Sequence, residues 1–401
     1  MNEKWQKLNL EECIEQVKYP NKILRKKFLE EGKFPIISQE QEFINGYWTN
    51  PVDVFRVNKP IIIFGDHTKI FKYVDFDFVL GADGVKILKP KDFIDSKYFY
   101  YFLNSCKIKS LGYARHYRIL KELNIRFPTS LPEQKRIVAI LDEAFEGIDR
   151  SIANTEKNLA NSRELFESYL NAIFTQKGDK WRNIKSQFVP LSTLLSEQPR
   201  NGWSPPAIFQ TGEGIPVLTL SAVTGFNYDG SRVKLTSAPT KEKAHYWLKE
   251  GELLITRSNT PELVGHVAIY DGNPQQAICC DLIMKMTLDS TKAHTKFIYY
   301  YLRSLAARKY LMSNATGASA TMPKINKQVV QNAPIPVFCL AEQKIIVTKL
   351  DGIASETQRL ESIYRQKLAA LKELKQSILQ KAFTGELTAD TPKTVKEKIA
   401  A

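Results

Sequence analysis

The sequence predicts two similar globular domains joined by two long antiparallel helices, an arrangement with an internal pseudo-two-fold repeat. Three observations lead to this fold class. The first is length, since 401 residues exceed what one compact domain usually holds. The second is a segment that occurs twice in the chain. The third is a heptad pattern of apolar residues inside that segment.

The repeated segment covers residues 131–175 and returns 209 positions later at 340–384. The copies align without a gap and share 17 of 45 residues, and each opens on Leu-x-Glu-Gln-Lys. A looser match precedes each copy, between 98–105 and 297–304. We therefore expect a globular domain, a helix, a second globular domain, a second helix and a polar tail at 1–130, 131–178, 179–339, 340–385 and 386–401.

Both copies of the segment have the sequence of a long helix. Ser130 as N-cap and Glu133 three residues later fit a capping box, and Gly178 and Gly385 are expected helix ends. Apolar residues recur at alternating three- and four-residue spacing, as in the seam of a coiled coil. The expected seam consists of Val138, Leu141, Phe145, Ile148, Ile152, Leu159, Phe166, Leu350, Ile353, Leu360, Tyr364, Leu371, Leu374 and Ile378.

A helix of about 45 residues, ~68 Å long, needs a packing partner along its length, and the other copy is the obvious one. The second domain begins a few residues after the first helix, and the second helix leaves that same domain. If the helices pair within the chain, they must run in opposite directions, with one domain at each end. The alternative is two ordinary helices packed on separate cores.

The net charge of the chain is +14, from 57 Lys and Arg against 43 Asp and Glu. By segment, residues 1–130 carry +6 and residues 179–339 carry +7, whereas residues 131–178 carry −2. A basic excess in both globular domains indicates a polyanionic partner such as nucleic acid. A solvated surface without such a partner explains an excess in one domain equally well, but explains two less well.

Other classes of protein find little support. No apolar run approaches the ~18 residues of a membrane-spanning helix, and the N-terminus lacks the apolar core of a signal peptide. The five cysteines form no C-x-x-C pair, which favours a reduced, cytoplasmic location without structural zinc. We find no phosphate-binding loop, no metal-spaced histidines, and no nuclease or amino-methyltransferase motif. A non-catalytic chain without a metal site is therefore favoured.

Polar loops that follow strand-like runs lie at matching places in both halves. Residues 64–67 align with residues 256–259. Arg257 and Asn259, which follow the apolar run 253–256, have side chains that can read guanine and adenine edges. The stretches 112–118 and 315–324 lie before the two long helices. For any one candidate, a surface role without DNA contact is an equal alternative. The candidate DNA-binding residues are Lys69, Arg115, His116, Arg118, Arg200, Arg257, Asn259, Thr316, Ser319 and Lys324.

The chain resembles the specificity subunit of Type I restriction–modification systems over nearly its whole length. The resemblance is carried by the Leu-x-Glu-Gln-Lys openings at 131–135 and 340–344, by Ala-Phe-Thr-Gly-Glu-Leu at 382–387, and by the stretch 251–260. It implies an α/β fold for each of two target-recognition domains and a non-catalytic role. Each domain would read one half of a bipartite DNA sequence, and the helix pair would space the halves.

The resemblance also implies partners. These are double-stranded DNA, two DNA adenine methyltransferase subunits that bind S-adenosylmethionine, and restriction subunits that use ATP with Mg, so no cofactor is expected on this chain. The first domain departs from the commoner pattern at 64–67, which indicates half-sites of different sequence. Two other classes stay open: a DNA-modifying enzyme with an unrecognised active site, and a coiled-coil scaffold without a DNA role.

Overall fold

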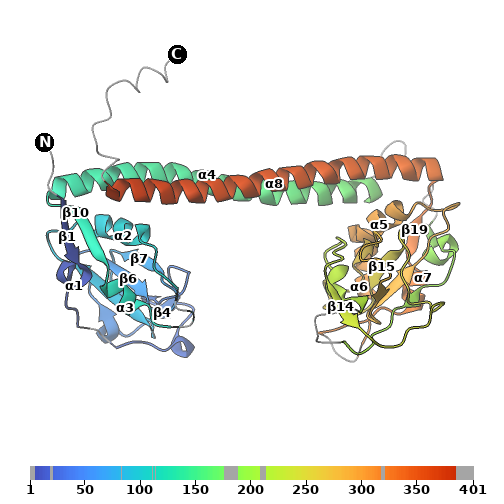
Figure 1. The fold of residues 1–401 in the computed structure, drawn as a ribbon, viewed down its shortest axis with the longest axis horizontal. Coiled ribbons are helices and arrows are strands. Elements are labelled where there is room, and N and C mark those ends of the chain that lie inside the picture. The colour runs from blue at the N-terminus through green and yellow to red at the C-terminus, as the bar shows by residue number, and fades with distance from the viewer. Residues whose placement is uncertain are drawn as a thin grey trace, which may run out of the picture. The chain divides into compact units, whose positions relative to one another are not determined.

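The computed structural model describes residues 5–18, 21–82, 84–110, 112, 114–175, 188–207, 214–317 and 321–384. The chain divides into a first unit, residues 1–156 with 365–401, and a second unit, residues 157–364. Each unit holds one domain of helices and strands and a part of both long helices, α4 (Leu131–Thr175) and α8 (Leu340–Thr384) (Figure 1). The predicted fold class is confirmed.

The first unit contains a four-stranded antiparallel sheet in the order β2-β9-β6-β7 and a second sheet in the order β4-β3-β8-β5. In the second sheet β3 and β8 are parallel and the other neighbours are antiparallel. Strand β1 pairs with β10 just before the long helix. The bounds are β1 Trp5–Asn9, β2 Ile14–Glu15, β3 Phe34–Ile37, β4 Gly46–Trp48, β5 Val54–Phe55, β6 Ile61–Gly65, β7 Phe71–Val74, β8 Phe78–Leu80, β9 Val85–Pro90 and β10 Asn124–Pro128, with helices α1 Leu10–Cys13, α2 Ser96–Ser105 and α3 Tyr117–Lys121.

The second unit repeats this topology. Its four-stranded antiparallel sheet has the order β12-β18-β15-β16, its second sheet the order β14-β13-β17 with β13 and β17 parallel, and β11 pairs with β19 before α8. The bounds are β11 Phe188–Pro190, β12 Arg200–Asn201, β13 Ile215–Leu218, β14 Val233–Thr236, β15 Leu253–Thr256, β16 Val267–Ile269, β17 Ile278–Cys279, β18 Ile283–Met286 and β19 Pro334–Pro336, with helices α5 Thr295–Arg303, α6 Leu305–Ser313 and α7 Lys327–Gln331. The internal repeat therefore extends from the helices to the sheets.

Strands β6 and β15 are inner strands of the two four-stranded sheets, and every residue of both strands is buried. Their sequences, Ile-Ile-Ile-Phe-Gly and Leu-Leu-Ile-Thr, lack the polar alternation of a strand with one wet face. One face of each strand packs on the domain helix and the long helices, since Phe64 shares a core with Phe99 and Leu141, and Ile255 shares one with Phe297. The sheets are thereby fixed to the helices that follow them.

The long helices pair within each unit, and they pair in opposite directions. In the first unit Asp149 of the early part of α4 accepts from Lys375 of the late part of α8 at 2.6 Å. In the second unit the late part of α4 meets the early part of α8, where Arg163 donates to Glu361 at 3.2 Å. The predicted antiparallel pairing is confirmed, whereas the predicted ends at Gly178 and Gly385 lie outside the described residues.

Each long helix is also joined to the domain before it. Gln134, fully buried, accepts from Asp95 N at 2.7 Å and donates to Phe93 O and Pro128 O at 3.0 and 2.8 Å. About two helical turns further along α4, Asp142 accepts from Lys97 Nζ and Tyr101 OH at 2.7 and 2.5 Å. The equivalent Asp351 of α8 accepts from Lys296 and Tyr300 at 2.8 and 2.6 Å. The same joint therefore occurs in both units.

The predicted seam residues differ in their burial. Val138, Leu141, Phe145 and Ile148 are buried, but they belong to the core of the first domain as well as facing α8. Leu374 is 48% exposed, and it lines an open groove together with Leu371 and Ile148. The heptad spacing identified the apolar face of each helix, but it did not reveal that the globular domain packs against the same face.

Among the described residues, no helix combines the length and the apolarity that crossing a membrane requires.

Candidate nucleic-acid interface

Arg257 is the first residue after β15, and its main chain is fixed on both sides. Its N–H donates to Leu282 O at 2.7 Å, and its carbonyl accepts from Ile325 N at 2.9 Å. Its side chain is half-buried, and within the described ranges no hydrogen bond or ion pair holds its guanidinium. A fixed backbone with an unengaged guanidinium suits a residue that makes its contacts with a ligand.

Thr316 and Lys324 are brought beside this loop by main-chain pairing. Lys324 forms isolated antiparallel bridges with both Ser258 and Thr316. Thr316 N donates to Lys324 O at 2.9 Å, and Lys324 N donates to Thr316 O at 2.7 Å. Both side chains are exposed, so three predicted contact residues, Arg257, Thr316 and Lys324, meet at one place. Ser319, predicted with them, lies outside the described residues.

Asn259 lies in the same loop, but its amide is already used. Its Oδ1 accepts from Thr260 N at 2.9 Å, and its Nδ2 donates to Thr224 Oγ1 at 3.3 Å. Reading an adenine with both ends of this amide would require giving up both contacts. The structure therefore favours a role of Asn259 in shaping the loop, and its contact with DNA stays a prediction.

Arg200 lies apart from this group, in β12 at the edge of the sheet, where its side chain is exposed. The residues after it cross closely over β17, and Gly202 is required there because a Cβ would lie 2.0 Å from Cys279 O. Trp203 then packs its ring 5.0 Å from that of Tyr246. Residues 200–203 thus form a separate basic and aromatic surface of the second unit.

In the first unit the predicted residues gather around Asp66, which follows β6 and is 2% exposed. Its carboxylate accepts from Tyr117 N at 2.7 Å, at the start of α3. His116 is fully buried; its N–H donates to Asp66 O at 2.9 Å, and its ring Nδ1 lies 2.9 Å from the same oxygen. The predicted DNA contact of His116 is therefore wrong, since no surface of its ring reaches solvent.

The cations around this histidine are differently placed. Arg115 and Arg118 flank His116 in sequence, and both are exposed. Lys69 lies at the end of the turn after β6 in the left-handed region, with φ of 62°, and its N–H donates to Gly65 O at 2.7 Å. The buried histidine therefore acts as a structural centre for a loop that presents basic side chains on its outside.

The alignment of 64–67 with 256–259 is wrong by one residue. Gly65 and Thr256 make the same ladder contacts, because each pairs with the first residue of the neighbouring strand, Val85 and Ile283. Asp66 therefore occupies the place of Arg257, and His116 N donates to Asp66 O as Ile325 N donates to Arg257 O. A slip of one residue exchanges the two faces of a strand, so the correction changes which side chains are equivalent.

The first unit has a contact set that the sequence patterns did not single out. Lys86 of β9 lies 5.1 Å, and Lys121 of α3 5.4 Å, from the ring centre of Tyr117. Tyr117 and Lys121 lie four residues apart on α3, and the fold brings Lys86 of β9 to the same ring. Because Lys121 also pairs with Glu11 at 2.6 Å, the positive surface suited to a phosphate backbone rests mainly on Lys86 and the exposed Arg115 and Arg118.

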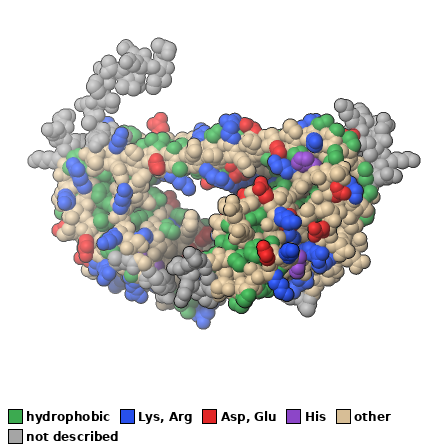
Figure 2. Space-filling model, turned by 45° about the vertical axis from the view of Figure 1, so that its right-hand side comes forward, with side chains coloured by type: hydrophobic (Ala, Val, Ile, Leu, Met, Phe, Trp, Pro, Cys, Tyr) green, Lys and Arg blue, Asp and Glu red, His purple; other side chains and the backbone are tan. Residues whose placement is uncertain are grey.

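Basic side chains are also spread over the wider surface of both domains. Figure 2 shows Lys and Arg side chains on the visible face of both domains, with fewer Asp and Glu side chains among them. This agrees with the positive net charge of residues 1–130 and 179–339. A field of this sign attracts a polyanion from solution before any specific contact forms.

In the described ranges, the metal-binding and reactive side chains are not arranged as a catalytic site requires. There, no group of three or more His, Cys, Asp or Glu is placed to hold a metal ion. Lys285 Nζ donates a hydrogen bond to the carboxylate of the buried Glu252 at 2.8 Å, and the Ser204 hydroxyl donates one to the carboxylate of Asp281. These side chains are therefore already engaged within the fold. Burial also raises the pKa of the Cys279 thiol and of the Cys280 thiol, which disfavours the thiolate form that a reactive cysteine needs.

A family model described as the Type I restriction modification DNA specificity domain matches residues 2–160 and 199–370. Among curated proteins, the EcoKI specificity subunit of a Type I restriction enzyme from Escherichia coli strain K12 is 28% identical over 335 residues, covering 79% of this chain and 71% of that protein. The StySPI specificity subunit from Salmonella potsdam is 28% identical over 315 residues, covering 75% and 68%.

Solved structures agree on the fold. A chain from a structure of a type I R-M system superposes with a TM-score of 0.70 at 19% identity, covering 95% of this chain and 98% of that one. The HsdS subunit from Thermoanaerobacter tengcongensis gives a TM-score of 0.50 at 20% identity, covering 95% and 97%. At identities of 19% and 20%, both comparisons support the fold of the chain alone.

Proposed function

The chain belongs to the Type I restriction modification DNA specificity domain family, whose model matches it twice, and from that premise we propose that it is the DNA-sequence-recognition subunit of a Type I restriction–modification complex. The observation that carries this proposal is the repeated architecture with unlike residues at equivalent loops. Asp66 and Arg257 hold the same position in the two units, one buried and acidic, the other with an unengaged guanidinium. Two domains of one fold with different contact residues suit a bipartite, asymmetric DNA site.

Affinity and specificity divide between two kinds of contact in this proposal. Exposed cations such as Lys324 and Arg115 bind phosphates and give salt-dependent affinity, which carries no sequence information. Arg257 discriminates bases through its paired donors, for which guanine offers two acceptors in the major groove. The long helices set the distance between the half-sites and dock two DNA adenine methyltransferase subunits, with restriction subunits joining the same complex.

The chain itself has no catalytic role in this proposal. S-adenosylmethionine, ATP and Mg are bound by the partner subunits, and this subunit contributes DNA sequence selection. The competing reading is a nuclease or methyltransferase with an unrecognised active site. Titrating the purified chain with S-adenosylmethionine and incubating it with plasmid DNA separates the two, because robust binding or turnover by the chain alone contradicts a recognition subunit.

The recognition role has a direct test. The purified chain, alone and with a methyltransferase subunit that co-purifies with it, is used to select duplexes from a random 40-base-pair pool. We expect enrichment of two short, different motifs separated by a constant unread gap. A single contiguous motif, or no enrichment in either form, would contradict the bipartite proposal.

A further inference from the structure

The loop from Arg257 to Gly265, which joins β15 to β16, is held by an arginine of helix α6. Arg308 is 8% exposed, and its Nη1 donates to Val264 O at 2.6 Å while its Nη2 donates to Glu262 O at 2.9 Å. In the described part of the chain Arg308 forms no ion pair, so the donors of a buried cation are directed to carbonyl oxygens of this loop. Burying a charge without a carboxylate is costly, and such a residue calls for an explanation.

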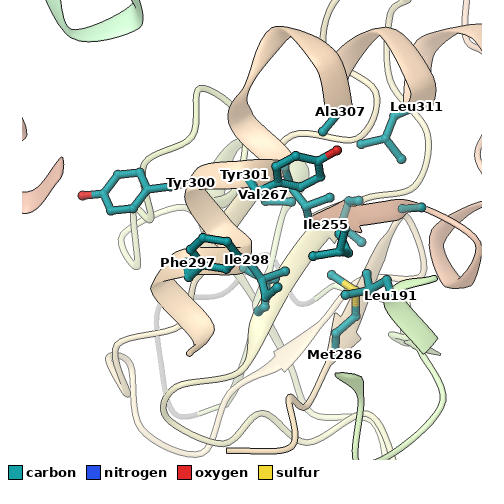
Figure 3. Packing of buried hydrophobic residues seen from close by; sticks show 14 of the residues in the cluster. Leu191, Ile255, Val267, Met286, Phe297, Ile298, Tyr300, Tyr301, Ala307 and Leu311 are labelled. Atoms are coloured by element: carbon teal, nitrogen blue, oxygen red, sulfur yellow. The ribbon is translucent and has the colours of Figure 1, made fainter. Parts of the chain in front are cut away.

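Helix α6 is itself anchored on the two strands that the loop connects. Figure 3 shows Ala307 and Leu311 of α6 pointing toward the strands that carry Ile255 and Val267. Arg308 is the next residue after Ala307, and it reaches the connection between those strands. The helix therefore fixes the strands and their loop as one body.

A second group of contacts, made by His266 and Phe226, holds the same loop. The His266 ring has its Nε2 3.0 Å from Glu262 O, and its Nδ1 accepts from Gly225 N at 3.0 Å. Its ring stacks on Phe226 with centroids 4.0 Å apart. Phe226 has a φ of 63°, a left-handed conformation that is costly for a bulky residue and persists only where the surroundings enforce it. Backbone strain of this kind is often found at binding sites.

The ends of the loop are fixed as well. Thr256 Oγ1 donates to Leu263 O at 2.9 Å, and Gly265 has a φ of 75° that favours glycine. A Cβ on Gly265 would lie 3.0 Å from Arg308 Nη1 and from Leu311 Cδ1, so the close approach of Arg308 depends on this glycine. The first unit closes its equivalent turn with the same kind of hydrogen bond, Gly65 N to Ile70 O at 2.9 Å against Thr256 N to His266 O at 2.8 Å, but its connection is shorter, with residues 66–69 in the place of 257–265. The held loop is a property of the second unit.

We propose that Arg308 is a positioning residue for DNA recognition, which holds residues 257–265 in the conformation that presents Arg257 to one half of the DNA site. The inference rests on the proposed function and adds a residue that does not itself touch DNA. A loop fixed before binding loses less conformational entropy on binding, so affinity and discrimination both gain. Because the contact occurs in one unit, its effect is confined to one half-site.

The test uses the full chain and a duplex that it selects from a random pool, together with two versions in which one half-site is scrambled. Arg308→Lys keeps the charge but replaces a planar fork by a single ammonium, which cannot hold both carbonyls in the same geometry. Gly265→Ala disturbs the same loop from within. Lys309→Gln, at an exposed neighbouring position of α6, is the matched control for a change in this helix.

We expect Arg308→Lys and Gly265→Ala to weaken binding of the selected duplex by roughly tenfold and to lose discrimination at the half-site read by the second unit. Discrimination at the other half-site and the circular dichroism spectrum stay as in the original chain, and Lys309→Gln binds normally. A purely structural role predicts equal losses at both half-sites; this outcome, or folded variants with unchanged discrimination, overturns the proposal.

If Arg308→Lys does not fold, Gly265→Ala decides alone by the same criterion. Failure of the proposed function gives a different result, since the original chain then enriches no sequence from the pool and Arg308 has no recognition to support.

Discussion

The side-chain amide of Gln343 makes in the second unit the same three backbone hydrogen bonds that Gln134 makes in the first. Gln343 Oε1 accepts from His294 N at 2.8 Å, and its Nε2 donates to Lys292 O and Phe338 O at 3.1 and 2.9 Å. The residue is 3% exposed. The glutamine of the repeated Leu-x-Glu-Gln-Lys opening is therefore explained by the fold, without any contact to DNA or to a partner.

Replacing this glutamine is expected to destabilise one unit. Gln343→Leu leaves one buried N–H and two carbonyls without the amide, so the free energy of unfolding of the second unit falls by about 2–4 kcal/mol. Urea unfolding measures the change, and Lys344→Gln at the exposed next position serves as the control. A loss below about 0.5 kcal/mol would show that water replaces the amide at no cost.

Arg257→Ala is expected to weaken binding of the selected DNA by about 1–3 kcal/mol if the guanidinium reads a base through two hydrogen bonds. Binding of a scrambled duplex should change much less. Arg232→Ala is the matched control for loss of one positive charge, because Arg232 is an exposed arginine of the same unit that pairs with Asp229 at 3.0 Å. Equal losses on every duplex would identify Arg257 as a phosphate contact.

Exchanging residues 1–130 for the corresponding region of a relative is expected to change one half of the methylated sequence. The other half and the gap should persist, because the second unit and both helices are retained. Sequencing of methylated adenines in cells that carry the hybrid complex measures the outcome. A change in both halves would refute the modular arrangement.

Lengthening both long helices by one heptad is expected to widen the unread gap. Insertions after Glu156 in α4 and after Tyr364 in α8 fall at the boundaries of the two units and leave each unit intact. Seven residues add ~10.5 Å of helix, which corresponds to about three base pairs of DNA. An unchanged gap in the selected motif would mean that the helices do not set it.

The stability of the second unit should fall with acidification. Burial, reinforced by the positive charge of Arg308, lowers the pKa of His266 from its ordinary 6.5 to about 4. The unfolded chain therefore binds a proton at His266 that the folded chain rejects, so stability is complete above pH ~6.5 and is lost as pH falls toward 4. At most, on the order of 3 kcal/mol is lost.

Comparing the chain with His266→Gln isolates this contribution, because burial also lowers the pKa of His294 and gives a slope of the same sign. The variant should show a shallower fall of stability between pH 6.5 and 4 in urea unfolding. An NMR titration that places the His266 pKa near 6.5 would remove the basis of the expectation.

The arrangement of the chain could be predicted from its sequence because the repeat and the heptads are long, periodic signals. A gap-free match over 131–175 and 340–384 fixes the number of units, and the starts of α4 and α8 coincide with those of the two copies. Periodicity names the apolar face of a helix but not what covers it. Leu374 keeps the heptad spacing and is nonetheless exposed.

The candidate site was less predictable, because its residues meet through main-chain pairing between distant segments. Lys324 reaches Ser258 by a bridge that no spacing reveals, and Lys86 reaches Tyr117 across two elements. His116 shared a basic, aromatic stretch with Arg115, but only the fold shows that its ring points inward. The one-residue error at Asp66 arose because two apolar runs of similar length align equally well in either register.

Identical joints beneath unlike loops have an evolutionary consequence. A genetic exchange whose crossover falls at the start of either long helix imports a new domain but keeps the glutamine and the aspartate that receive it. The incoming domain needs to supply backbone groups and a lysine and tyrosine four residues apart, as at Lys97 and Tyr101 or at Lys296 and Tyr300. Recombination can thus renew the recognised sequence in one step, while mutation alters the loops without disturbing their attachment.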